Sequence, residues 1–316
     1  MQGLMQQTPL LVSSLVRHAE KYHGNTEIVS VRHTGEITRS NWARLAERAR
    51  KVANALGDLG IRAGERVASI AWNRLPHMEL YYGVTGTGIT LHTVNPRLFP
   101  EQIIYIINHA ENRYVFVDPD LISVAEAAAP ELPYVEGWIL LCHREEMPQT
   151  NLPNTLCYED LVDAAEEEFE WPALDEACAS TLCYTSGTTG NPKGVLYSHR
   201  STVLHAFCAT AADGMALTSR DTVLLATPLF HVNAWGMPYA AAMVGAKLVL
   251  PGSALDGEAV YNLLKEERCT FSLGVPTLWF GVLDFIELNG DSKHRNALCL
   301  ERVLSGGAAV PKSMIE

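Results

Sequence analysis

The sequence has no C-x-x-C pair, although it carries seven cysteines among its 316 residues. The cysteines are dispersed and odd in number, whereas a disulfide framework or a zinc site would need pairs or closely spaced groups. Both kinds of site are therefore excluded, and we expect reduced thiols in the core. The cysteines are Cys142, Cys157, Cys178, Cys183, Cys208, Cys269 and Cys299.

Positive charge is also in short supply. Lysine and arginine total 24 against 36 acidic residues, which gives a formal net charge of −12. A general nucleic-acid binder needs a basic face to neutralise phosphates, so we expect no nucleic-acid partner. A nucleotide substrate is not excluded, because one local cradle can hold a phosphate against the overall charge.

Long apolar runs and a secretion signal are missing as well. No uncharged apolar run approaches the ~18 residues that a membrane span requires. The N-terminus has an apolar patch at Leu10–Val12, but no basic flank precedes it and no small-residue cleavage site follows. We therefore expect a soluble cytoplasmic protein with no integral membrane segment.

The residues that are present alternate between helical and strand patterns. Apolar side chains recur at helical spacing from Trp42 to Leu56, after Ser40 as a possible N-cap and before Gly60 as a possible end. Further helices are predicted at His77–Val84 and Pro100–His109. Strands are predicted at Val67–Trp72, Ile89–Val94, Tyr114–Val117, Thr181–Tyr184, Thr222–Ala226, Lys247–Leu250, Thr270–Val275 and Leu300–Leu304. Such alternation predicts an α/β fold in which right-handed crossovers build a mainly parallel sheet covered on both faces.

The region from about Leu141 to Glu176 interrupts this alternation. It carries several prolines and an acidic run, Glu166–Glu168, which we interpret as the solvated face of a helix. The interruption separates two α/β blocks, residues 1–176 and 177–316. The blocks could form one intertwined domain or two separate ones.

One segment, from Tyr184 to Val195, combines glycines and hydroxyls directly after a buried strand. Glycines let the backbone approach a ligand closely with its N–H groups free, and hydroxyls add donors for phosphate oxygens. Lys193 supplies a cation, and the turn at Asn191-Pro192 can aim it back at the site. The common ATP loop is excluded, because it needs glycine directly before the lysine and Pro192 stands there. The segment predicts a different kind of phosphate loop.

This segment, with Tyr197-Ser198-His199 after it, resembles the signature phosphate loop of the adenylate-forming superfamily. That superfamily includes acyl-CoA synthetases, luciferases and peptide-synthetase adenylation domains. The resemblance covers essentially the whole chain, is closest to medium- and long-chain fatty acyl-CoA synthetases, and implies two packed, mainly parallel sheets with helices on both faces. The other segments that carry it are 228–235 (PLFHVNAW), 305–311 (SGGAAVP), 91–98 (LHTVNPRL) and 106–110 (IINHA).

The resemblance also implies roles for individual residues. Thr185 would help to hold Mg²⁺, and His231 and Lys193 would take part in catalysis, with His231 near the α-phosphate and the acyl carboxylate. Residues implied in binding the ATP phosphates are Thr185, Ser186, Gly187, Thr188, Thr189, Gly190 and Lys193. Those implied in the acyl pocket are His231, Val232, Trp235 and Gly306, and those at the adenine are Gly307, Ala308 and Ala309.

The implied reaction activates a carboxylic acid, chiefly a medium- to long-chain fatty acid, with ATP and then coenzyme A. The carboxylate attacks the α-phosphorus and expels pyrophosphate, and the thiol of coenzyme A then displaces AMP from the acyl-adenylate. Positioning of the reactants and neutralisation of charge account for most of the catalysis. Mg²⁺ and Lys193 would therefore offset the negative charge on the departing pyrophosphate. Close relatives of this kind are often homodimers, and we expect the same here.

Several family segments do not occur in the chain. There is no Y-G-x-T-E segment, no T-G-D segment and no small C-terminal domain with its adenylation lysine, and Lys312 follows 305–311 too closely to be that lysine. We therefore expect the N-terminal part of a ligase, incomplete at its C-terminus, with uncovered apolar surface and doubtful turnover alone. Two alternatives stay open: a non-catalytic nucleotide- or acyl-binding module, and an adenylation domain that loads a carrier protein.

Overall fold

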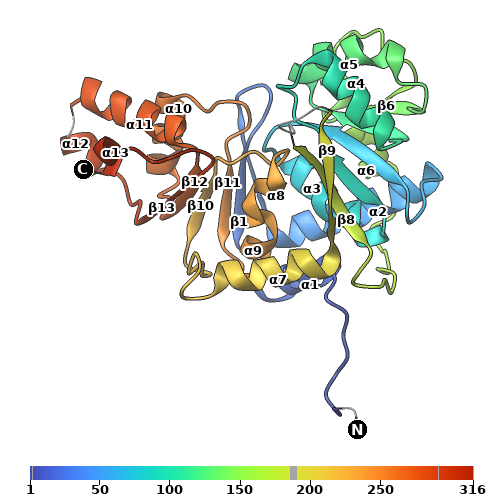
Figure 1. The fold of residues 1–316 in the computed structure, drawn as a ribbon, viewed down its shortest axis with the longest axis horizontal. Helices are drawn as coiled ribbons and strands as arrows, with labels where there is room; N and C mark the ends of the chain where they lie inside the picture. Colours follow the sequence, from blue (N-terminus) through green and yellow to red (C-terminus); the bar gives the residue numbers. More distant parts are fainter. Residues whose placement is uncertain (2, 186–190, 291, 316) are drawn as a thin grey trace.

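The computed structural model describes residues 1, 3–185, 191–290 and 292–315, which form two β-sheets with helices around them (Figure 1). In sheet A the strand order is β13-β12-β10-β11-β1-β2, and in sheet B it is β7-β6-β5-β3-β4-β8-β9. Sheet A contains β1 (Glu27–Val31), β2 (Ile37–Asn41), β10 (Thr222–Leu225), β11 (Lys247–Leu250), β12 (Phe271–Gly274) and β13 (Arg302–Ser305). Sheet B contains β3 (Arg66–Ile70), β4 (Thr90–Thr93), β5 (Tyr114–Val117), β6 (Gly137–Leu140), β7 (Thr155–Cys157), β8 (Ala179–Thr185) and β9 (Lys193–Ser198).

The two sheets are mainly parallel, as the sequence predicts. Neighbouring strands pair in parallel except at one edge of each sheet, where β1–β2 and β8–β9 are antiparallel. The predicted α/β class is therefore confirmed. In a parallel sheet the carboxyl ends of the strands meet along one edge, and that edge is where ligands bind in open α/β sheets.

Helices cover both faces of both sheets and form a layer between them. α1 (Val12–His23), α2 (Trp42–Asp58), α3 (Leu75–Gly83), α7 (His199–Thr210) and α9 (Met237–Val244) contribute to a core that also takes side chains from both sheets. α4 (Pro100–His109) and α5 (Ile122–Ala128) bury their apolar faces on the other side of sheet B. α10 (Gly257–Glu266) and α11 (Pro276–Leu288) do so on the other side of sheet A. Shorter helices are α6 (Tyr158–Ala164), α8 (Val232–Trp235), α12 (Ser292–Arg295) and α13 (Lys312–Ile315).

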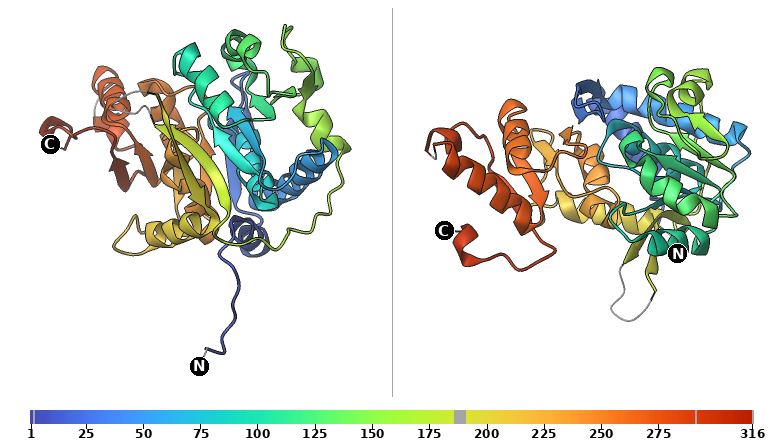
Figure 2. Two further views of the ribbon diagram at one scale, coloured as in Figure 1. Left: turned by 45° about the vertical axis from the view of Figure 1, so that its right-hand side comes forward. Right: turned by 90° about the horizontal axis from the view of Figure 1, so that it is seen from above.

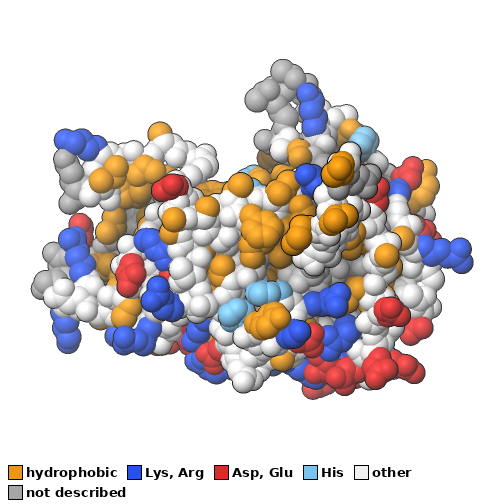
Figure 3. All heavy atoms as spheres, turned by 90° about the horizontal axis from the view of Figure 1, so that it is seen from below, with side chains coloured by type: hydrophobic (Ala, Val, Ile, Leu, Met, Phe, Trp, Pro, Cys, Tyr) orange, Lys and Arg blue, Asp and Glu red, His pale blue; other side chains and the backbone are white. Residues whose placement is uncertain are grey.

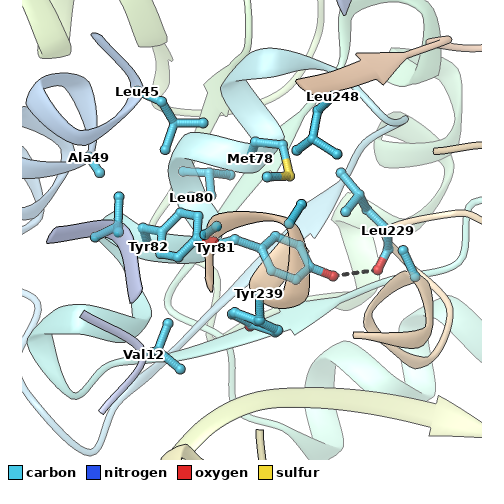
Figure 4. Packing of buried hydrophobic residues seen from close by; sticks show 14 of the residues in the cluster. Val12, Leu45, Ala49, Met78, Leu80, Tyr81, Tyr82, Leu229, Tyr239 and Leu248 are labelled. Atoms are coloured by element: carbon cyan, nitrogen blue, oxygen red, sulfur yellow. Dashed lines mark hydrogen bonds between the residues drawn. The ribbon is translucent and has the colours of Figure 1, made fainter. Parts of the chain in front are cut away.

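Tyrosines from α3 and α9 lie at the centre of the core between the sheets (Figure 4). Tyr81, Tyr82 and Tyr239 are fully buried, and the ring centroid of Tyr239 is 5.8 Å from that of Tyr81 and 6.1 Å from that of Tyr82. A buried hydroxyl needs a partner, and Tyr81 finds one by donating to the Leu229 carbonyl at 2.5 Å. The core therefore connects directly to the loop that follows β10.

The sheets draw strands from distant parts of the chain. β1 pairs with β11 through Ile28 and Leu248, while β4 pairs with β8 through Leu91 and Thr181. The N-terminal block thus supplies the β1–β2 edge of sheet A, and the C-terminal block supplies the β8–β9 edge of sheet B. Figure 2 shows the C-terminal helices at one end of the molecule and α2, α4 and α5 toward the other.

Two local predictions need correction. Asn41 rather than Ser40 caps α2, because the Asn41 side chain accepts from the Arg44 N–H at 2.8 Å. The acidic run Glu166–Glu168 is exposed, as expected, but it follows the end of α6 and is not helical. There, Asn54 of α2 donates to the main-chain carbonyls of Glu166 and Glu168, so these carbonyls are satisfied outside a helix.

Some apolar side chains are exposed on the surface. Figure 3 shows such side chains across the middle of one face. Val195 and Leu196 of β9 and Leu204 and Phe207 of α7 are among the exposed apolar residues, as is Val303 on edge strand β13. No helix in the described parts of the chain combines the length and apolar character needed to cross a bilayer.

Candidate active site

The β8–β9 hairpin holds the two ends of the predicted phosphate loop. Thr185 ends β8, Lys193 begins β9, and the two are paired across the hairpin, both exposed. Ser186, Gly187, Thr188, Thr189 and Gly190 lie outside the described residues. The hairpin therefore brings a hydroxyl and a cation together at the ends of the segment that the sequence singles out.

A second segment of the site follows β10 at the carboxyl end of sheet A. Ala226, Thr227, Leu229 and Phe230 are buried, and the chain then exposes His231. Both main-chain groups of Leu229 are held: its N–H donates to Asn73 Oδ1 at 2.7 Å, and its carbonyl accepts from Tyr81. This loop is consequently fixed from behind by Asn73, which follows β3, and by Tyr81 of α3.

The loop ends in a left-handed turn, α8. Five consecutive residues from Val232 to Gly236 have φ between 48° and 73°. Left-handed backbone costs an L-residue roughly 1–2 kcal/mol, and only Gly236 adopts it freely. Strain of this kind persists where surrounding contacts over-determine it, and it concentrates at functional sites.

Asn233 supplies those surrounding contacts. It is 5% exposed, its Nδ2 donates to Thr181 Oγ1 at 2.8 Å, and its Oδ1 accepts from Tyr81 Oη at 3.4 Å and from Cys183 Sγ at 3.5 Å. Thr181 and Cys183 belong to β8, the strand that leads to the phosphate loop. One buried amide therefore ties the His231–Trp235 turn to the β8–β9 hairpin.

A cavity of about 410 Å³ opens where these strand ends converge. It takes His231 and Trp235 from the turn and Gly307 from the segment after β13. Walls also come from the ends of β4 and β12. The lining residues are Asn95, Arg97, Ala226, Thr227, Pro228, Phe230, His231, Trp235, Leu255, Val275, Thr277, Leu278 and Gly307. The mixture of apolar walls and a few polar groups is typical of a small-molecule site.

Trp235 also borders a second cavity of about 260 Å³, which lies toward α7 and α9. Val232 lines this second cavity and not the first, as do Tyr197, His205 and Tyr239. Trp235 therefore stands between two spaces. Gly306 backs it closely, since a Cβ on Gly306 would lie 3.0 Å from Trp235 Cη2.

The segment after β13 is more open. Gly307, Ala308 and Ala309 are exposed, and Gly307 has a φ of 81°, which glycine adopts without strain. Gly307 lines the first cavity, while Ala308 and Ala309 do not. The structure thus brings His231, Trp235, Gly306 and Gly307 together and leaves Ala308 and Ala309 on the surface beside them.

The neutral groups behind the site stay protonated at ordinary pH. Burial raises the pKa of Tyr81 well above its usual value, and it raises the pKa of the Cys183 thiol as well. Tyr81 can therefore act as a hydrogen-bond donor without adding charge. The charged groups at the cavity and hairpin are cations, from Arg97 and Lys193.

Thr185 is the residue for which the family resemblance implies a role at Mg²⁺. No group of three His, Cys, Asp or Glu side chains in the described ranges has the geometry of a metal site. An exposed hydroxyl at the end of β8 still suits Mg²⁺, because this ion keeps several waters and binds mainly through substrate phosphates. The residues present therefore fit an ion that arrives with a nucleotide.

Several lining residues carry no role in the sequence analysis: Asn95, Arg97, Thr227, Leu255, Val275, Thr277 and Leu278. Asn95 comes directly after the predicted strand Ile89–Val94, and Val275 is the last residue of the predicted strand Thr270–Val275. The rule that ligands meet the carboxyl ends of parallel strands could therefore have found them. Asn73, which supports the wall from outside the cavity, gives the same signal, because it directly follows the predicted strand Val67–Trp72.

Comparison with known proteins places this arrangement in a family. Residues 15–316 match the family of AMP-binding enzymes. The chain is 50% identical over 315 residues to a medium-chain-fatty-acid–CoA ligase of Ectopseudomonas oleovorans, covering all of this chain and 57% of that protein. It is 47% identical over 315 residues to a 3-methylmercaptopropionyl-CoA ligase of Ruegeria lacuscaerulensis, covering all of this chain and 58% of that ligase.

A solved structure agrees in fold. An anthranilate CoA ligase in complex with anthranoyl-AMP superimposes with a TM-score of 0.85 at 22% identity, over 99% of this chain and 58% of that one. This chain therefore spans little more than half the length of the proteins it matches. With a family match over nearly its whole length and two sheets of the same architecture, the chain belongs to the family of AMP-binding enzymes, and its relatives include acyl-CoA ligases.

Proposed function

We propose that this chain is the nucleotide- and acyl-binding part of an AMP-forming acid–CoA ligase. The observation that carries the proposal is the cavity of about 410 Å³, in which His231, Trp235 and Gly307 meet at the carboxyl ends of sheet A. A carboxylic acid bound there would lie with its carboxylate at the exposed imidazole and its tail along the apolar wall. Medium- to long-chain fatty acids are the proposed substrates, with ATP and coenzyme A as co-substrates.

The proposed chemistry needs position more than covalent participation. His231 would orient the carboxylate and the α-phosphate, and Lys193 would neutralise charge on the departing pyrophosphate. The phosphates would lie along residues 185–190, with the adenine at Gly307, Ala308 and Ala309. Mg²⁺, when bound to the triphosphate, supplies further charge neutralisation, and Thr185 would hold it. The strained turn would keep His231 and Trp235 in place before the substrate arrives.

Other features belong to the same proposal because they rest on family resemblance. We propose a homodimer, a cytoplasmic location and a role in fatty-acid activation. The two blocks, residues 1–176 and 177–316, are proposed to be subregions of one large domain. The interleaved strands of sheets A and B favour subregions over independent domains.

The test measures pyrophosphate release with MgATP and a fatty-acid series from short to long chain. The 316-residue chain is compared with a version extended through any downstream coding sequence. We expect the extended protein to release pyrophosphate and Lys193→Ala to lower its rate by about 100-fold, a typical loss for one electrostatic group. Arg200→Ala, which removes a surface cation paired with Glu176, is the matched control and should retain the rate.

An alternative function is favoured if neither version releases pyrophosphate while the short chain still binds ATP. The protein would then be a nucleotide-binding module without turnover. If the extended protein forms acyl-adenylate but transfers it only to a carrier protein, coenzyme A is the wrong acceptor. Each result thus indicates a different function for the same cavity.

A further inference from the structure

Asn73 holds the cavity wall from a position just beyond a strand of the other sheet. It follows β3 of sheet B and is 3% exposed. Its Nδ2 donates to the carbonyls of Leu225 at 2.7 Å and Thr227 at 2.8 Å, and its Oδ1 accepts from the Leu229 N–H at 2.7 Å. One side chain therefore satisfies three main-chain groups of the loop that carries Thr227, Pro228 and Phe230 into the cavity.

The main chain of Asn73 makes a further connection to sheet A. Its carbonyl accepts from the Gly252 N–H at 3.0 Å, and Gly252 lies just beyond β11. Asn73 thus contacts the carboxyl ends of two neighbouring strands of sheet A, β10 and β11, although the strand that precedes it, β3, belongs to sheet B. A shift of one sheet relative to the other would have to break these bonds.

Trp72 contacts two residues that line the cavity. The Arg97 guanidinium lies 5.5 Å from the Trp72 ring centroid, and the Phe230 ring packs edge-on at 5.8 Å. Arg97 lies beyond the end of β4 in sheet B, whereas Phe230 lies beyond the end of β10 in sheet A. The indole is therefore the spacer between a wall residue from each sheet.

The Trp72–Asn73 pair is itself anchored on its sheet B side. The Trp72 N–H donates to Asp118 Oδ2 at 2.7 Å, at the end of β5. The next residue, Arg74, is 4% exposed and pairs with Asp118 and Asp120, both at 2.9 Å. Because Arg74 and Asp118 are buried, the Trp72–Asn73 pair has little freedom to follow a displaced wall.

We propose that Trp72 and Asn73 are positioning residues that set the separation of the two walls of the 410 Å³ cavity, and thereby how tightly it holds an acyl group. The inference rests on the proposed function, since it assigns that cavity to the acyl part of the ligand. It extends that function to two residues that line no part of the cavity. Asn73 fixes the sheet A wall by hydrogen bonds. The Trp72 ring sets the distance between Arg97 on one wall and Phe230 on the other.

The matched substitution is Asn73→Asp, which keeps the size and the acceptor but replaces the amide donor. At neutral pH it would set a carboxylate oxygen against two carbonyl oxygens, so the wall loop must move away. Trp72→Leu keeps every Asn73 bond and thins the spacer instead. The control is Asn54→Asp, because Asn54 Nδ2 also donates to two main-chain carbonyls, those of Glu166 at 2.7 Å and Glu168 at 3.0 Å, away from the cavity.

The experiment measures, by calorimetry on the full 316-residue chain, the Kd for AMP and the Kd for octanoyl-sulfamoyl-adenosine, a stable acyl-adenylate analogue. The ratio of the Kd for AMP to the Kd for the analogue reports how much the acyl group adds to binding. In Asn73→Asp we expect this ratio to fall about tenfold, which corresponds to loss of well-fitted apolar contacts, with less than about a twofold change for AMP. Trp72→Leu should lower the ratio as well, and Asn54→Asp should leave it unchanged.

The outcomes separate the two proposals. If the wild-type chain binds the acyl analogue no better than AMP, the assignment of the cavity to the acyl group fails, and the positioning proposal fails with it. If the wild type shows the acyl gain but Asn73→Asp weakens both ligands equally, Asn73 is only structural and the positioning proposal is wrong. Should Asn73→Asp prove unfolded in a thermal melt, Trp72→Leu decides: an unchanged ratio overturns the proposal.

Discussion

The carboxyl ends of β10 and β13 both lead into the candidate site, but they are built in opposite ways. β10 lies inside sheet A between β12 and β11, and its following loop is buried and held by Asn73, Tyr81 and Asn233. β13 is the edge strand, and the residues after it are exposed. The same sheet thus offers one wall that is fixed before any ligand binds and another that has few contacts.

The difference separates two ways of making a binding surface. Around β10, buried amides and a tyrosine hydroxyl hold a strained left-handed turn, so its geometry is determined by packing. After β13, glycine flexibility and short side chains let the backbone approach a ligand, so the geometry depends on what binds. Substitutions on the β10 side should therefore cost stability, and substitutions on the β13 side should cost mainly affinity.

The largest expected effect is that of Asn233→Ala. The change leaves the buried Thr181 hydroxyl oxygen without its amide donor and places alanine where φ is 51°. Unsatisfied buried groups cost about 1–3 kcal/mol and left-handed alanine another 1–2 kcal/mol, so we expect a loss of about 4 kcal/mol in the free energy of unfolding. Urea denaturation measures it. Asn289→Ala, which removes an exposed bond to the Phe285 carbonyl, is the control and should cost far less.

A pH titration of Asp118→Asn tests the anchor behind the β10 wall. Burial raises the pKa of Asp118 to about 6, above its ordinary 3.8. The folded state therefore binds the proton more tightly than the unfolded state, and Asp118 contributes stability below pH 4 that is lost as the pH rises through 6. We expect wild type to lose about 2 kcal/mol relative to Asp118→Asn between pH 4 and pH 7. A pH-independent difference between the two proteins would contradict this assignment.

Substitutions at two adjacent glycines should affect the binding of AMP and of the octanoyl analogue to different extents. Gly307→Ala places a side chain at a φ of 81° and 3.2 Å from Val275 Cγ1, so we expect a loss of about 1 kcal/mol and weaker AMP binding. Gly306→Ala instead pushes on Trp235 and should weaken the octanoyl analogue more than AMP. Calorimetric titration of both ligands into both variants gives the comparison. Equal losses for both ligands would remove the distinction between the walls.

The smallest expected effect is that of Ala308→Ser. Ala308 is exposed and lies outside the cavity lining. Surface substitutions away from special features change stability by less than about 0.5 kcal/mol, and we expect that here. If denaturation shows a larger loss, the segment after β13 is more tightly packed than its exposure indicates.

Much of the fold follows from local sequence patterns. Apolar runs such as Tyr114–Val117 and Lys247–Leu250 coincide with β5 and β11, and the proline in the first turn marks the start of α4. These features are predictable because burial on both faces and helix capping act within a few residues. The α/β class follows from their alternation.

Long-range contacts are the part that the sequence does not reveal. The β1–β2 hairpin was not predicted, and no local signal assigns it to a sheet completed by β11. The left-handed turn from Val232 to Gly236 contains valine and tryptophan, which ordinarily avoid that conformation, so only its tertiary contacts explain it. Asn73 is predicted only as the residue that follows a strand. Its support of the cavity wall depends on side-chain hydrogen bonds to residues more than 150 positions away.

The pairing of β1 with β11 also sets the order in which the chain can fold during synthesis. Ile28 and its partner Leu248 are 220 residues apart, whereas sheet B is complete once β9 has been made. At ~5–20 residues per second, the ribosome needs roughly 10–45 s between the two strands. During that interval the β1–β2 hairpin has no parallel neighbour, and its open edge is a target for chaperones or for misassembly with another nascent chain.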